Sequence, residues 1–139
     1  MTGILWLWVP AGAQTVQKFK GRLSPVPIDG SMQSIIAGSG SMSAELAGSK
    51  LTISGTFEGL RSPATVARLH RGPDAGIKGP ALADLTVSRA TSGTVGGAVE
   101  LTSTQVEALK RHQLYVQIHS EKAPDGNLWG WFFEEGHRQ

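Results

Sequence analysis

The 139-residue chain contains no cysteine. It therefore cannot form a disulfide, offer a thiol nucleophile or bind a metal ion through thiolates. The absence does not identify a compartment, because oxidising compartments also hold proteins without cysteine. Chemistry based on thiolate ligands or thiol attack is thus excluded.

Charged residues are few, at 17%, and the formal net charge is only +2. The Lys and Arg residues are scattered without any run of like charge, so the sequence does not predict a basic patch that would bind nucleic acid. Hydrophobic residues make up 40% of the chain, which indicates a globular domain rather than a disordered polyelectrolyte or a membrane bundle. The length fits one domain with a single core.

No hydrophobic run approaches the roughly 20 residues that a transmembrane helix needs. The apolar run at residues 4–9 is followed by Pro10 and then by Ala11, Gly12 and Ala13, which is typical of the end of a secretory signal. No Lys or Arg precedes the run, and the run is short for a signal, so we expect a signal shortened by a late start. The alternative is an N-terminal β-strand packed on the core.

The signal hypothesis divides the chain into three parts. Residues 1–13 form the signal peptide, residues 14–134 form one domain, and residues 135–139 form a polar tail. It predicts that the mature protein is secreted or periplasmic.

Glycine and proline are abundant, with 18 and 7 residues, and their spread along the chain favours short strands joined by turns. The clearest strand lies at residues 50–58, where Leu51, Ile53 and Phe57 share one face and polar residues share the other. Less regular patterns predict further strands at residues 15–23, 39–46, 65–71, 81–88, 93–101, 113–119 and 127–133.

One short helix is predicted at residues 102–111. Thr102 and Gln105 have the spacing of a capping box, and Val106 and Leu109 lie on one helical face. With about seven or eight strands and one helix, the expected fold is an all-β, antiparallel β-sandwich with Greek-key links.

The last two predicted strands form a hairpin around a Pro-Asp-Gly turn at residues 124–126. The alternation of the two strands pairs Ile118 with Leu128, which puts both core faces on one side. The opposite face then carries Tyr115 beside Trp131.

Five landmarks follow one another along residues 16–132. They are Phe19…Leu23…Pro25-Val-Pro27, Gly55-x-x-x-Gly59-Leu60, Leu69-His70-x-Gly72-Pro73, Leu101-Thr102…Leu109 and Tyr115-Val-Gln-Ile-His119…Pro124-x-Gly126. Their order resembles the CHRD domain, a family named for its occurrence in chordin and also found alone in secreted bacterial proteins. The resemblance implies an all-β, extracytoplasmic domain with a poorly defined biochemical role that is not a recognised enzyme family.

The chain departs from the family pattern at three places. At one of them, Ser120 follows His119 where the family usually has threonine. The family usually shows His-x-His before Gly-Pro, and here the first of these positions is Arg68. The last strand usually reads Gly-Glu-Ile-Arg-Gly-Gln, and here Trp129 and Trp131 occupy two positions that are usually polar.

Two histidines, His70 and His119, remain from the family's histidine arrangement. Imidazole nitrogens on neighbouring strands could hold copper or zinc, so a metal-binding β-sandwich is the alternative function. Arg68 points the same way as His70 on the predicted strand and would oppose a cation. We expect instead that no cofactor is bound and that both histidines hydrogen-bond to loop carbonyls at the strand ends.

The candidate ligand-binding residues are Tyr115, Trp129 and Trp131. If positions 129 and 131 face outward, the three rings form an aromatic strip suited to a protein or carbohydrate partner. Alternatively, the tryptophans line the second sheet or pack under the loop at residues 72–80. Because no carboxylate pair, Gly-x-Ser-x-Gly motif or phosphate loop occurs, we expect a non-enzymatic, extracytoplasmic binding domain.

Overall fold

Nine strands and one helix make up the part of the chain that the computed structural model describes, residues 16–26 and 35–135. The expected signal peptide at residues 1–13 lies outside the described residues. The helix is α2 (Ser103–Lys110). The strands are β1 (Val16–Pro25), β2 (Ser39–Ala47), β3 (Lys50–Glu58), β4 (Ala64–Arg71), β5 (Ala81–Val87), β6 (Gly93–Glu100), β7 (Leu114–Ser120), β8 (Leu128–Trp131) and β9 (Phe133–Glu134).

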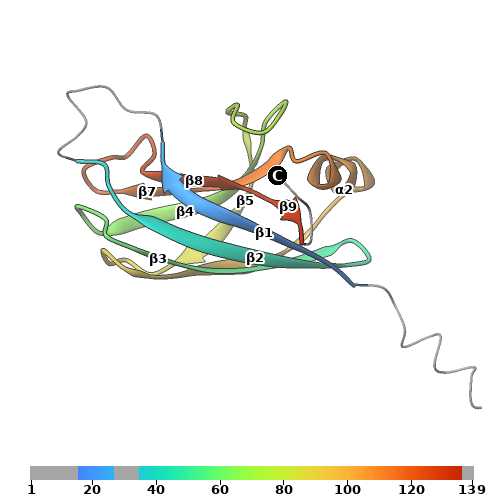
Figure 1. Ribbon diagram of the computed structural model, residues 1–139, viewed down its shortest axis with the longest axis horizontal. Coiled ribbons are helices and arrows are strands. Elements are labelled where there is room, and N and C mark those ends of the chain that lie inside the picture. Colours follow the sequence, from blue (N-terminus) through green and yellow to red (C-terminus); the bar gives the residue numbers. More distant parts are fainter. Residues whose placement is uncertain (1–15, 27–34, 136–139) are drawn as a thin grey trace, which may run out of the picture.

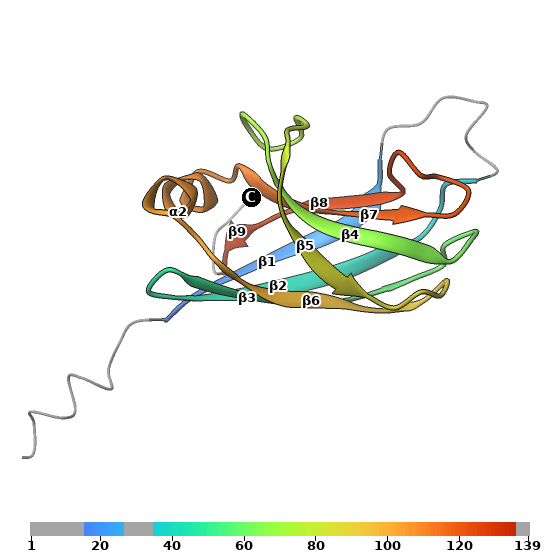
Figure 2. The ribbon, with the colours of Figure 1, turned by 180° about the vertical axis from the view of Figure 1, so that it is seen from behind.

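The first eight strands close into an antiparallel barrel, so the all-β prediction is confirmed and the sandwich is wrong. Their order is β2-β3-β6-β5-β4-β7-β8-β1, and β1 pairs again with β2. The barrel is flattened, with β4, β7 and β8 in one layer and β2, β3 and β6 in the other (Figures 1 and 2). Two strands join these layers: β1 pairs with both β2 and β8, and β5 pairs with both β4 and β6.

The expected Greek-key connection is present. β4, β5 and β6 follow one another as neighbours, and the chain then returns through α2 so that β7 lies beside β4. The predicted strand at residues 127–133 is split in two, because β8 ends at Trp131 and β9 begins at Phe133 and pairs with β1.

One hydrophobic cluster fills the barrel. The alternation that predicted the strands places one apolar face of each strand inside, where burial of apolar surface stabilises the fold. The largest apolar side chains of this cluster that are fully buried are Phe19, Leu23, Leu51, Leu69, Leu109, Leu114, Ile118, Leu128 and Phe132.

Helix α2 covers one end of the barrel (Figure 1). The predicted capping box is confirmed, since the Gln105 backbone N–H donates to Thr102 Oγ1 at 3.1 Å and the Thr102 N–H donates to Gln105 Oε1 at 2.9 Å. Ala108 and Leu109 turn inward and are buried. No helix in the described part of the chain is long and apolar enough to cross a membrane.

The closing hairpin has the predicted register. Ile118 pairs with Leu128, and Tyr115 pairs with Trp131. Leu128 and Ile118 are completely buried inside the barrel. Tyr115 and Trp131 therefore lie on the outer face, because side chains alternate along a strand.

Two glycines let β1 lie close against β8. A side chain at Gly21 would overlap the carbonyl oxygen of Trp131, and one at Gly130 would overlap the carbonyl oxygen of Arg22. This close approach brings the outward side of β1 next to the tryptophans of β8.

Candidate functional site: an aromatic groove under the β4–β5 loop

A stack of three rings crosses the outer face of β4, β7 and β8. Tyr115 stacks on Trp131 with ring centroids 4.4 Å apart and on His70 with centroids 4.9 Å apart. Trp129 meets Tyr115 and Trp131 edge-on, at 6.0 Å and 4.7 Å. These separations are those of favourable aromatic pairs. The three residues proposed from the sequence are thus in mutual contact.

The loop between β4 and β5, residues 72–80, folds over this stack. The Gly79 N–H donates to Tyr115 Oη at 2.8 Å, and the Tyr115 hydroxyl lies 3.1 Å from the Gly79 carbonyl oxygen, to which it donates. Tyr115 is 1% exposed and Trp131 is 8% exposed, whereas Trp129 is half-buried. The three rings are in contact, but Tyr115 and Trp131 are buried, and only Trp129 is partly accessible.

The two ends of the β4–β5 loop are held together by close backbone packing. A side chain at Gly72 would overlap the carbonyl oxygen of Ile77, and one at Gly79 would overlap that of Arg71. The Arg71 N–H also donates to the Pro80 carbonyl at 3.0 Å. The loop therefore covers the stack as a packed element of the domain.

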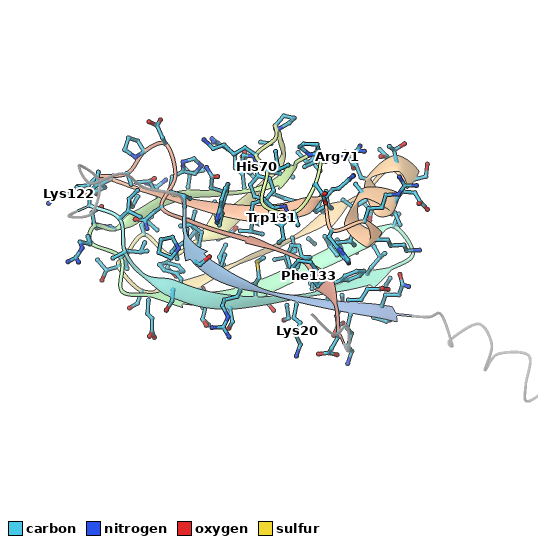
Figure 3. All side chains as sticks on the ribbon, turned by 45° about the horizontal axis from the view of Figure 1, so that its top comes forward. Lys20, His70, Arg71, Lys122, Trp131 and Phe133 are labelled. Atoms are coloured by element: carbon cyan, nitrogen blue, oxygen red, sulfur yellow. The ribbon has the colours of Figure 1, made fainter. Side chains whose placement is uncertain are left out.

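A groove of about 390 Å³ remains beside the stack, and we call it the aromatic groove. This volume is at the lower end of the range for small-molecule sites, about 300–1,000 Å³. Figure 3 shows Trp131 and His70 on the same face of the barrel. The groove is lined by Arg22 and Ser24 of β1, Ala75 and Gly76 of the loop, Trp129, Gly130 and Trp131 of β8, and Phe133 of β9.

The polar groups of the aromatic groove are mainly donors. Trp131 Nε1 is buried and has no hydrogen-bond partner among the described residues. Arg22 is the one charged residue among the described residues that line the groove, and Ser24 adds a hydroxyl. Because Trp131 Nε1 is closed to solvent, Arg22 and Ser24 are the polar side chains that a molecule in the groove can reach.

The two histidines proposed as metal ligands are each held by a loop carbonyl. His70 Nδ1 donates to the Gly79 carbonyl at 2.9 Å, and His119 Nδ1 donates to the Pro124 carbonyl at 2.8 Å. The expectation that they hydrogen-bond to loop carbonyls is confirmed. Burial lowers the pKa of His70 below its ordinary value of 6.5, and the nearby charges of His119 and Arg68 lower it further, against the Gly79 hydrogen bond.

The two histidines do not fit a shared metal ion. His70 pairs with Tyr115 and His119 with Val66, so they lie four residues apart along the strands, about 13 Å at roughly 3.3 Å per residue. His119 Nε2 lies 3.4 Å from the Gln117 amide nitrogen, which donates to it. Among the described residues, no group of three or more His, Asp or Glu side chains could hold a metal.

Arg68 lies on the same face of β4 as His70, as expected. It forms an ion pair with Asp84, with 2.9 Å between Nε and Oδ1. Both partners are substantially exposed, so the pair adds little stability. Along β4, Arg68 lies between His70 and Val66, the residue that pairs with His119.

A larger groove, of about 780 Å³, crosses the outer face of β2, β3 and β6. Its walls are mostly Ser, Thr and Gly, with Lys20 at one side. Among the described residues, it has neither an aromatic ring nor a buried polar atom without a partner. The aromatic groove is therefore the better candidate for a specific ligand.

Sequence reasoning found the aromatic rings but missed the other groove residues. Arg22 and Ser24 face outward on β1, as the alternation around Phe19 and Leu23 indicates. Their proximity to Trp129 depends on the pairing of β1 with β8, in which Ser24 lies opposite Trp129. That pairing joins segments far apart in the sequence. Strand periodicity, which is a local pattern, therefore does not predict that β1 and β8 are neighbours.

The comparison with known families agrees with the landmarks in the sequence. The family model of the CHRD domain matches residues 12–131, most of the chain. No curated protein and no solved structure matches the chain. CHRD domains are non-catalytic, binding-type domains of extracellular type. The resemblance is confirmed, and the chain belongs to the CHRD domain family.

Proposed function

We propose that this CHRD domain is a non-enzymatic, extracytoplasmic binding domain and that its ligand site is the aromatic groove. One observation carries the proposal: a groove of about 390 Å³ combines the partly exposed ring of Trp129 with the side chains of Arg22 and Ser24. Aromatic surface supplies contact area, and a few placed polar groups supply specificity. The β4–β5 loop borders the groove through Ala75 and Gly76.

A catalytic role has little support in the groove. Among the described residues that line it, none carries a carboxylate, a histidine ring or an amine. The groove therefore lacks a general base and a strong nucleophile. The family also supports binding rather than catalysis.

The site is tested by comparing two variants for retention on panels of immobilised oligosaccharides and peptides. Trp129→Ala removes the accessible ring, and Ile77→Ala changes an exposed loop side chain that does not line the groove. We expect at least one panel member to retain the wild type and Ile77→Ala but not Trp129→Ala. If no panel member is retained, or if Trp129→Ala is retained equally, the proposed site is wrong.

The extracytoplasmic location is tested separately. The apolar run before Ala13 and the extracellular type of the family both support it. When the full chain is expressed in a bacterial host, protein from the periplasm or medium should begin at Gln14. A protein that keeps Met1 and stays in the cytoplasmic fraction would contradict this location.

A further inference from the structure

The charge on the side chains that line the aromatic groove is positive. Arg22 lines it, and among the described residues no Asp or Glu does. Arg22 forms no ion pair with any residue of the described part of the chain. In the β4–β5 loop, Asp74 precedes the lining residue Ala75 but does not itself line the groove. Its carboxylate accepts a hydrogen bond from the Ala75 N–H at 2.8 Å. The groove thus favours a ligand with negative charge.

The side-chain donors surround an aromatic floor. Trp129 and Trp131 meet at 71° between ring planes, so the two indoles present different surfaces at one place. Arg22 and Ser24 contribute donors from β1. A sugar ring matches this arrangement, because it has an apolar face for stacking and oxygen acceptors at its edge.

An extended peptide fits this groove less well. Peptides that lie along a sheet bind by adding a strand to an exposed edge. At the groove, β8 is already paired on both sides, with β7 and with β1. The barrel therefore offers no free strand edge here, and recognition must come from side chains.

From these contacts we infer that the aromatic groove binds an anionic sugar, a pyranose carrying a carboxylate or a sulfate. This inference rests on the proposed function, because it names the ligand class of the same site. The sugar ring stacks on Trp129, and its anionic group pairs with the Arg22 guanidinium. An arginine fork suits both anions, since it can donate two parallel hydrogen bonds.

Intrinsic fluorescence can report on this binding. The chain has four tryptophans, and in a full-length background with Trp6→Phe and Trp8→Phe the two that remain are Trp129 and Trp131, both in the groove. The probes are trigalacturonate, a sulfated galactose oligosaccharide, neutral maltotriose and a short peptide with a free C-terminal carboxylate. We expect one or both anionic sugars to bind at least tenfold more tightly than maltotriose, and the two anionic arms distinguish carboxylate from sulfate.

Arg22→Gln should weaken binding of the anionic sugar about tenfold, because a charge-assisted hydrogen bond is lost. Arg61→Gln, which changes an exposed arginine outside the groove, is the matched control and should leave affinity unchanged. Added salt should weaken binding to the wild type more than to Arg22→Gln.

Three outcomes would overturn the inference. Equal binding of maltotriose and the anionic sugars, or binding of the peptide alone, overturns the anionic-sugar class while the proposed binding site stands. If no probe changes the fluorescence, the inference also fails, and the panel experiment with Trp129→Ala then decides the proposed function independently. If Arg22→Gln binds the anionic sugar as tightly as the wild type does, Arg22 does not pair with the anionic group and the inference is wrong.

Discussion

Tyr115 and Gly79 are joined by a reciprocal pair of hydrogen bonds. The Gly79 N–H donates to the tyrosine oxygen at 2.8 Å, and the tyrosine hydroxyl donates to the Gly79 carbonyl at 3.1 Å. Gly79 lies near the end of the β4–β5 loop, and Tyr115 lies at the centre of the ring stack. This pair therefore couples the position of the loop to the aromatic groove that the loop borders.

Tyr115→Phe should loosen the loop. The change keeps the stacked ring but leaves the Gly79 N–H without its partner, so we expect the free energy of unfolding to fall by about 1–2 kcal/mol. Collisional quenching of tryptophan fluorescence by acrylamide should rise as the loop opens, because Trp131 becomes more accessible. Denaturant unfolding and quenching measure the two effects. Ile77→Ala, at a side chain that is 52% exposed, is the control and should change neither. Unaltered stability and quenching in Tyr115→Phe would show that the hydroxyl does not hold the loop.

Trp131→Ala and Trp129→Ala should separate folding from binding. Trp131 is 8% exposed and stacks on Tyr115, so its truncation should cost about 3–5 kcal/mol. Trp129 is half-buried, and its truncation should cost clearly less while still removing the accessible ring of the groove. Urea unfolding of both variants provides the comparison. Equal losses of stability would contradict the different burial of the two rings.

The hairpin was predictable because its signals are local. The turn at residues 124–126 and the apolar alternation of two adjacent strands fixed the pairing of Ile118 with Leu128. The capping box of α2 was predictable for the same reason, since Thr102 and Gln105 are three residues apart. The all-β class and the helix position followed from local patterns of this kind.

Closure of the barrel was not predictable from strand periodicity. Strands alternate in the same way in a sandwich and in a barrel, and the difference lies in which edges pair. Here β1 pairs with both β2 and β8, which closes the sheet and brings Arg22 to the groove. The burial of Tyr115 also depended on a distant segment, because the loop at residues 72–80 has no pattern that shows where it packs.

Asn127 should be essential to the stability of the hairpin end. Ser120 Oγ donates to Asn127 Oδ1 at 2.7 Å, and Asn127 Nδ2 donates to the Ala37 carbonyl at 2.9 Å. Ser120 and Asn127 are both fully buried. Asn127→Ala leaves a hydroxyl and a carbonyl without partners, so we expect a loss of about 2–3 kcal/mol in urea unfolding. Asp125→Ala, at an exposed turn position, is the control, and a similar loss there would contradict this assignment.

Copper and zinc titrations test the alternative metal function. Because His70 and His119 lie four residues apart and hydrogen-bond to different loops, we expect no tight stoichiometric site that depends on both. Isothermal titration of copper(II) and zinc(II) into the wild type and His119→Ala provides the measurement. Tight binding of one equivalent of copper or zinc that is lost in His119→Ala would contradict this expectation and support the metal-binding function.

The stability of the domain should depend on the protonation of His70. Its Nδ1–H is donated to Gly79, so protonation adds a proton at Nε2, which is buried and has no hydrogen-bond partner among the described residues. Burial lowers the pKa of His70 in the folded protein below the ordinary value of 6.5, and the positive charges of Arg68 on β4 and His119 on β7 act in the same direction.

The unfolded chain therefore binds this proton more readily than the folded protein does. The contribution of neutral His70 to stability is fully present above pH 6.5, falls as the pH drops below 6.5, and stops falling once the pH passes below the lowered pKa. Urea unfolding from about pH 8 to about pH 5 should show this loss in the wild type. In His70→Phe, which keeps an aromatic ring against Tyr115 but cannot titrate, the pH slope in that window should be smaller. Equal slopes in the two proteins would show that His70 does not carry the pH dependence.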